Sequence, residues 1–280
     1  MSKIFDDNII FSFEITNAYI FKQIFNIHSK LNISSVPFYF KEDGITILTG
    51  STSKANNRRV IIDIEIDGDE ILEYYLNKEL CSVKISEDNE YACHIEQLDI
   101  NMLIGILKSI QKATSLQIYK TTNNDEISIN IKHTTTEKTK MSCGKFQEVE
   151  YDINRFQNIS PQPNVKVDIN QFCNGIKSMT RGDPEYVSFK IFPEGLIIES
   201  KNNNETVIKD WFSGIIKEDY DETDYVETKV NTNMIKSLSK INTMLTNSIV
   251  KIYSEENGYL KISHRVADYG ENHIYFIDGT

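Results

Sequence analysis

The sequence of 280 residues predicts an α+β fold with two similar domains of antiparallel β-sheet and two helices in each domain. Three observations support this fold class. Short runs of alternating apolar and polar residues indicate many strands. Only four segments show helical periodicity. A similar three-residue motif opens each of these four segments, which indicates an internal repeat.

The predicted strands are rich in Ile, Val and aromatic residues, which favour a pleated, half-buried backbone. Seven runs show this pattern: residues 9–13, 36–40, 45–48, 60–66, 116–119, 127–131 and 187–192. Short clusters of Asn, Asp, Glu, Pro and Gly predict hairpin turns between runs. They lie at residues 42–44, 123–125, 193–195 and 256–258.

The four predicted helices carry apolar residues at three- and four-residue spacing, so that each has one apolar face. They span residues 16–31, 101–112, 170–181 and 233–245. Each begins with an Asn, Asp or Thr that can cap its first turn. In the last helix the apolar face consists of Ile235, Leu238 and Ile241.

The shared motif before the helices defines a fourfold strand–helix–strands repeat. Its copies are Ile15-Thr16-Asn17, Asp99-Ile100-Asn101, Asp168-Ile169-Asn170 and Asn231-Thr232-Asn233. Two repeats in each half predict domains at residues 1–147 and 165–280. The stretch 148–164, which contains Pro161 and Pro163, is the predicted linker between them.

The charges are unevenly distributed along this acidic chain. The chain has 30 basic and 41 acidic residues, and a net charge of −11 argues at first against binding a polyanion. The four helices, however, contain no acidic residue and eight basic ones: Lys22, Lys30, Lys108, Lys112, Lys177, Arg181, Lys236 and Lys240. No Arg-rich recognition helix is evident, so these residues predict non-specific, salt-sensitive contact with a phosphate backbone.

Several other classes of protein are disfavoured. Four cysteines (Cys81, Cys93, Cys143 and Cys173) and five scattered histidines match no zinc or redox spacing, so no cofactor or metal is expected. The acidic run 218–224 lacks the spacing of a calcium loop and is expected to be a solvated loop. No apolar run is long enough for a membrane helix, and the N-terminus has no secretory signal, so we expect a nuclear or cytoplasmic protein that is not secreted.

The C-terminal residues resemble the last two strands of PCNA-type sliding clamps. Residues 261–270 read Lys-Ile-Ser-His-Arg-Val-Ala-Asp-Tyr-Gly, and Ile274-Tyr275-Phe276 follow. Clamps typically end with an Ala-Asp-x-Gly turn and then an aromatic strand. Residues 233–256 are similar to the last clamp helix and strand, with Lys240 at the matching lysine. The composition, rich in Ile, Asn and Lys, resembles divergent clamp homologues of large DNA viruses, which would place the protein at a viral replication site.

This resemblance implies a DNA clamp fold that assembles into a closed trimeric ring. The repeat helices, with the eight basic residues given above, would line the hole around duplex DNA. Subunits would pair through edge strands at residues 140–151 and 205–212, with apolar contacts from Val207, Ile208 and Trp211.

The resemblance also implies a groove for the short aromatic motif of partner proteins: a DNA polymerase, other clamp-binding proteins and a clamp loader. The matching residues are Ile153, Phe156, Ile159, Tyr259, Tyr275 and Ile277. The family usually has Ala-Pro after the terminal strand. Here Asp278-Gly279-Thr280 follow Ile277, a departure that bears on how the usual motif docks.

The implied function is a non-enzymatic processivity factor and docking platform in DNA replication and repair. One alternative is a clamp-fold protein that acts as a monomeric or dimeric processivity factor, or in checkpoint signalling or late transcription. A more remote alternative is a metal-dependent nuclease with dispersed carboxylates, which would leave the four basic helices unexplained.

Overall fold

A computed structural model describes residues 8–31, 33–52, 59–84, 92–108, 110, 114–132, 137–142, 165–192, 195–201, 207–212, 225–244, 249–255 and 259–277. The chain forms two compact units. Unit 1 comprises Met1–Thr49, Asp63–Glu148 and Val266–Glu271, and unit 2 comprises Gly50–Ile62, Val149–Arg265 and Asn272–Thr280. Each unit contains most of one predicted domain and a short segment from the other half of the chain. The predicted linker, residues 148–164, lies outside the described residues.

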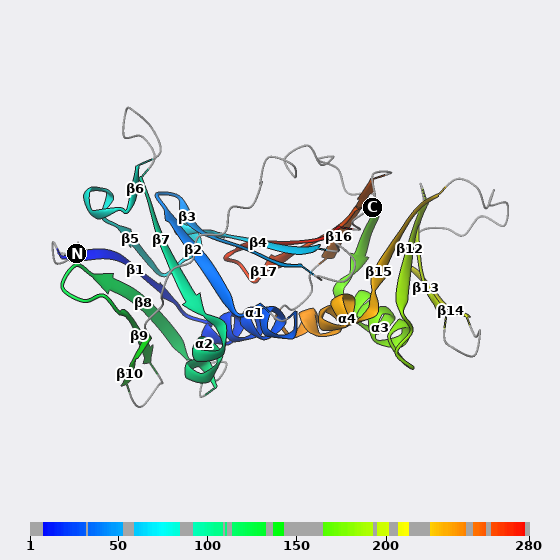
Figure 1. Cartoon of the computed structure of the whole chain (residues 1–280), viewed down its shortest axis with the longest axis horizontal. Coiled ribbons are helices and arrows are strands. Elements are labelled where there is room, and N and C mark those ends of the chain that lie inside the picture. The colour runs from blue at the N-terminus through cyan, green and yellow to red at the C-terminus, as the bar shows by residue number, and fades with distance from the viewer. Residues whose placement is uncertain are drawn as a thin grey trace. The chain divides into compact units, whose positions relative to one another are not determined.

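The N-terminal half of the chain contains two helices and ten strands among the described residues (Figure 1). They are β1 (Ile9–Ile15), α1 (Ala18–Lys30), β2 (Ser35–Lys41), β3 (Gly44–Thr52), β4 (Arg59–Asp67), β5 (Glu73–Leu76), β6 (Val83–Lys84), β7 (Ala92–Asp99), α2 (Ile100–Leu107), β8 (Ser115–Thr121), β9 (Ile127–Lys132) and β10 (Glu137–Ser142). Two short 3₁₀ turns, η1 (Gly68–Glu70) and η2 (Lys78–Leu80), flank β5.

The C-terminal half repeats this sequence of elements. They are β11 (Val165–Asp168), α3 (Ile169–Met179), β12 (Tyr186–Phe192), β13 (Gly195–Lys201), β14 (Val207–Phe212), β15 (Val226–Asn231), α4 (Thr232–Ile235), the 3₁₀ helix η4 (Lys236–Met244), β16 (Ile249–Glu255), β17 (Tyr259–Val266) and β18 (Gly270–Ile277). All seven strands predicted from the sequence are confirmed, and the described strand pairs are antiparallel.

The strand pairing confirms the fourfold repeat. In each half, the strand before one helix pairs with the strand after the other helix. These pairs are β1 with β8, β7 with β2, β11 with β16, and β15 with β12. Two strand–helix–strands repeats therefore interlock to form each half.

Backbone hydrogen bonds at the helix starts also join the two repeats of each half. In three helices, the backbone N–H of the first residue donates to a carbonyl of the other repeat in the same half. That carbonyl belongs to the residue just before the strand that follows the other helix. These bonds join Ala18 to Thr114 (3.0 Å), Ile100 to Ser34 (2.9 Å) and Thr232 to Glu185 (3.1 Å). An N–H that the helix itself cannot satisfy is thus used to join the two repeats.

Each unit contains one sheet of its own and a second group of paired strands. In unit 1, one sheet has the strand order β10-β9-β8-β1-β5, and the remaining strands run β4-β3-β2-β7-β6. In unit 2, one sheet has the order β14-β13-β12-β15, and the remaining strands run β11-β16-β17-β18. Strands β3, β4, β17 and β18 each carry residues of both units, which is why the units are not continuous in sequence.

Phenylalanine side chains fill the core of unit 1. Phe11 and Phe40 stack with their ring centroids 3.7 Å apart, and Phe21 and Phe25 meet edge to face at 5.7 Å. All four are at most 1% exposed. Burying each such side chain contributes on the order of 1.5–3 kcal/mol, so the core fixes α1 against the strands beside it.

The fourth helix differs from its prediction as a single α-helix over residues 233–245. Only Thr232–Ile235 is α-helical, and Lys236–Met244 is a 3₁₀ helix. Its buried residues Ile235, Leu238 and Ile241 are spaced by three throughout, which matches three residues per turn. In addition, the Ser237 hydroxyl donates to the carbonyl of Met234 (3.1 Å), a local bond that competes with α-helical pairing.

The Ala-Asp-Tyr-Gly turn between β17 and β18 is anchored in unit 1. Tyr269 accepts a hydrogen bond from the backbone N–H of Asp67 at its carbonyl (2.8 Å) and from the backbone N–H of Asn17 at its hydroxyl (3.2 Å). A Cβ atom on Gly270 would lie 1.9 Å from the carbonyl oxygen of Glu65. The turn therefore requires glycine at position 270, because the backbone of β4 occupies the space of a side chain.

Candidate nucleic-acid interface

The shared motif caps the helices that carry the predicted DNA contacts. Asp99 accepts from the backbone N–H of Met102 (2.7 Å), Asp168 from that of Asn170 (2.9 Å), and Asn231 from that of Asn233 (3.0 Å). The first copy behaves differently, since Asn17 makes no side-chain cap bond. In three of the four copies the first residue of the motif thus caps the helix, two residues before the predicted helix start, and each cap fixes where an exposed helix face begins.

Helices α3 and η4 pack together in unit 2 by their apolar faces. The Cys173 thiol donates to the carbonyl of Leu238 (3.5 Å), and both side chains are buried. The opposite sides of the two helices are exposed and hold four predicted DNA contacts: Lys177, Arg181, Lys236 and Lys240. These four residues, called the unit 2 helix face below, bring together positions about 60 residues apart in sequence.

One member of this face is engaged by an acid that the sequence analysis missed. The Lys236 ammonium lies 2.7 Å from Asp183 Oδ1. The Gly182-Asp183 pair, three and four residues past the end of α3, could have been noticed, because Gly and Asp commonly adopt the left-handed backbone that turns a chain after a helix. The sequence could not show that the turn points its carboxylate at a lysine 53 residues away.

In unit 1, helices α1 and α2 lie side by side and carry the remaining predicted contacts (Figure 1). Lys30 and Lys108 are exposed. Lys22 has a structural role, because its ammonium donates to the carbonyls of Lys108 (3.0 Å) and Ile110 (3.4 Å). It thereby satisfies carbonyls at the end of α2, where a positive charge is favourable. Lys112 lies outside the described residues.

The described residues of the predicted partner groove lie on β17 and β18. Tyr275 and Ile277 are two positions apart on β18 and therefore face the same side of the sheet. The Lys261 ammonium lies over the Tyr275 ring at 5.3 Å, so Lys261 is a member of this surface that the sequence analysis missed. Tyr259 is two residues from Lys261 on the same face of β17. Ile153, Phe156 and Ile159 lie outside the described residues.

The predicted subunit contacts fall on strands at sheet edges. Strand β10 begins the strand order of its sheet in unit 1, and β14 begins that of its sheet in unit 2. Each pairs with one described neighbour, β9 and β13 respectively. The side chains of Val207, Ile208 and Trp211 lie outside what the structure describes, so their contact role stays a prediction.

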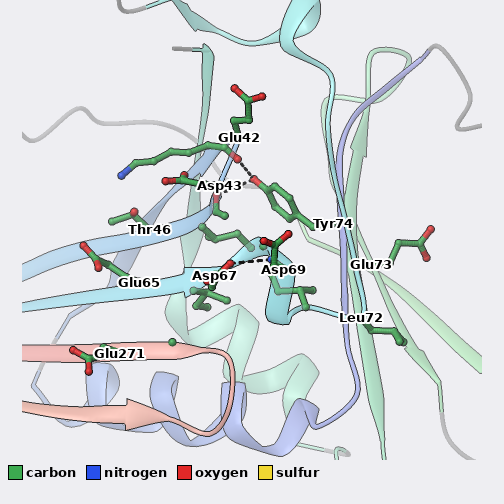
Figure 2. Close-up of a pocket in the computed structure, with 17 residues that line it drawn as sticks. Glu42, Asp43, Thr46, Glu65, Asp67, Asp69, Leu72, Glu73, Tyr74 and Glu271 are labelled. Atoms are coloured by element: carbon green, nitrogen blue, oxygen red, sulfur yellow. Dashed lines mark hydrogen bonds between the residues drawn. The ribbon is translucent and has the colours of Figure 1, made fainter. Parts of the chain in front are cut away.

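A hollow of about 930 Å³ in unit 1 is acidic, in contrast to the basic helix faces (Figure 2). Its lining includes Lys41 and seven carboxylates: Glu42, Asp43, Glu65, Asp67, Asp69, Glu73 and Glu271. Strands and turns carry these acids, whereas the predicted DNA contacts are on helices. A surface of this charge repels a polyanion, which agrees with the predicted segregation of basic helices from an acidic remainder.

A buried polar cluster in unit 1 bears on the nuclease alternative. Burial would raise the pKa of Glu96, but hydrogen bonds from His94 and Lys120, together with the charge of Lys120, hold it below its ordinary value. The side chains of His94, Glu96 and Lys120 are 8%, 11% and 17% exposed, so the cluster lies inside the unit and not at a surface open to substrate.

The described residues contain neither a metal-binding cluster nor a membrane-spanning helix. No group of three or more His, Cys, Asp or Glu side chains is arranged to hold a metal ion. None of the described helices has the length and apolar character needed to cross a membrane. The acidic run 218–224 falls outside the described residues.

Comparison of the sequence with protein-family models and with curated proteins finds no match. The structure does match solved structures. A chain of the PCNA2–PCNA3 complex from Sulfolobus tokodaii gives a TM-score of 0.71 at 16% identity, over 95% of this chain and 98% of that chain. The proliferating cellular nuclear antigen of Entamoeba histolytica gives 0.74 at 12% identity, over 97% and 100%. The chain has the PCNA clamp fold.

The clamp fold confirms the predicted fold class, and it confirms the resemblance of the C-terminal residues to PCNA-type clamps. The likeness covers nearly the whole chain, although the sequence resemblance is specific only over residues 233–280. The elements that carry the predicted DNA contacts are therefore the helices of a clamp fold.

Proposed function

We propose that the protein is a DNA sliding clamp, in which three copies close around duplex DNA and tether a polymerase to it. The likeness to PCNA structures over nearly the full length of both chains is the observation that carries this proposal. The tether acts by enclosing the duplex rather than by tight binding, so a net charge of −11 is compatible with it.

The exposed basic residues on the helices support a contact with phosphates. Lys30, Lys108 and the unit 2 helix face are exposed positions on or directly beside helices whose other exposed residues include Asn170, Asn174 and Asn233. Contacts to phosphates carry no sequence information and weaken with salt. Such contacts suit a protein that moves along DNA of any sequence.

Partner docking is proposed at the aromatic surface of β17 and β18. Tyr259 and Ile277 are half-buried and offer apolar area beside the Lys261 ammonium, which lies over the ring of Tyr275, a side chain that is itself only 6% exposed. Aromatic residues at such a surface are common anchors for a partner segment. The protein in this proposal is a non-catalytic docking platform that works in the nucleus or cytoplasm, where DNA is replicated.

The oligomeric mass tests this proposal. We expect light scattering at about 10 µM to give about 97 kDa, three times the 32.3 kDa of one chain, because edge strands β10 and β14 pair between subunits. Replacing Val207 and Ile208 by Glu should lower the mass to that of one chain. The control Leu72→Glu changes a side chain that is already 63% exposed and should keep the trimer mass. A monomer of the unaltered protein at this concentration contradicts the ring.

A further inference from the structure

The turn after α3 places a carboxylate on the unit 2 helix face. Gly182 and Asp183 both have positive φ angles, 79° and 47°. These left-handed residues reverse the chain after α3, which ends at Met179. As a result Asp183 Oδ1 accepts a hydrogen bond of 2.7 Å from the Lys236 ammonium at the start of η4.

Stability does not account for this ion pair. The side chains are 53% exposed for Lys236 and 78% exposed for Asp183. Pairs as exposed as this contribute little to folding, because water screens them and two flexible side chains must be held in place. The turn itself does not need a carboxylate, since Asn adopts the left-handed region at least as readily as Asp.

The pair also changes the charges that a ligand of the helix face would meet. A phosphate that approaches Lys236 meets an ammonium that already has an anionic partner, and a second negative charge beside it. Phosphate binding must displace the carboxylate and then tolerate its repulsion. Lys177 and Arg181 are exposed on the same face and can meet phosphates beside this pair.

We propose that Asp183 weakens the contact between this face and DNA by competing with phosphate for Lys236. This inference rests on the proposed function and names a residue that limits the strength of DNA binding at the same site. A weaker phosphate contact lowers the residence time at each position on the duplex. Asp183 thus sets how freely the protein moves along DNA while the ring keeps it attached.

The test measures binding of a short fluorescent duplex by anisotropy at several salt concentrations, with Asp183→Asn against the unaltered protein. Asn keeps the left-handed turn and removes only the charge. We expect tighter binding and one additional phosphate contact, so the advantage of Asp183→Asn should shrink about 3.5-fold between about 50 and about 200 mM salt. Asp125→Asn is the matched control, because it removes an exposed carboxylate from the β8–β9 turn of unit 1. We expect a smaller change for this control.

A second background shows whether Lys236 is the group for which Asp183 competes. When Lys236 is already replaced by Met, adding Asp183→Asn should increase the affinity for the duplex only as much as Asp125→Asn does. The proposal is overturned by an equal gain with and without Lys236, or by weaker binding of Asp183→Asn. If the unaltered protein binds with the usual salt dependence and Asp183→Asn matches it, only this inference fails. If neither protein binds the duplex at low salt, the proposed function fails as well.

Discussion

Replacing Lys108, Lys177 and Lys240 together by glutamine is expected to weaken DNA binding strongly and to flatten its salt dependence. The three residues are exposed and lie directly after α2, on α3 and on η4, at positions where the clamp fold places its repeat helices. Loss of three phosphate contacts should reduce the slope of log affinity against log salt by about 2.7. Between about 50 and about 200 mM salt, the affinity of the unaltered protein should therefore fall about 40-fold more than that of the variant.

A control variant separates local contact from total charge. Lys41, Lys166 and Lys229 are exposed lysines on strands, and their replacement by glutamine changes the net charge by the same amount. We expect this control to keep most of the salt slope. Equal slopes for the helix variant and the unaltered protein would contradict the assignment of the helices to DNA. Light scattering on each variant verifies that the assembly is unchanged.

The second large effect is expected from Gly270→Ala, which should lower the free energy of unfolding by about 3 kcal/mol. An added Cβ would lie 1.9 Å from the carbonyl oxygen of Glu65 and 3.1 Å from the Cα of Ile66. Both atoms belong to the backbone of β4, so no side-chain rotation relieves the overlap. Either β4 or the turn that holds Tyr269 must move, and the bonds from Asp67 and Asn17 to Tyr269 weaken.

Gly105→Ala is the matched control for this substitution. Gly105 lies within α2, and a Cβ there would meet nothing within 4 Å. Because alanine favours a helix over glycine, this variant should be more stable by about 0.5–1 kcal/mol. Denaturant unfolding measures both changes. A Gly270→Ala protein as stable as the unaltered one would show that the turn does not pack against β4 as described.

Periodicity and local motifs allowed much of the fold to be predicted. The strands follow from alternation, and the caps at Asp99, Asp168 and Asn231 follow from residue type at a helix start. The repeat was visible because three of its four copies place a capping Asp or Asn directly before a helix. The Ala-Asp-Tyr-Gly turn was specific because its glycine meets a backbone atom of β4 that excludes other residues.

Features that depend on long-range contact could not be predicted in the same way. The ion pair of Asp183 with Lys236 and the bonds from Lys22 to the end of α2 join residues 53 and 86 positions apart. Nothing local in the sequence marks either partner. The 3₁₀ character of η4 was present in the spacing of Ile235, Leu238 and Ile241, but spacings of three also occur in α-helices.

Retention on a linear duplex with blocked ends tests the central claim most directly. The protein is allowed to thread onto a duplex that carries biotin at both ends, streptavidin is added to close the ends, and the complex is washed at about 0.5 M salt, which removes phosphate contacts. We predict that the protein stays on the blocked duplex and is lost from the same duplex with free ends. Equal loss from both, or equal retention on both, would contradict a clamp that holds DNA by enclosing it.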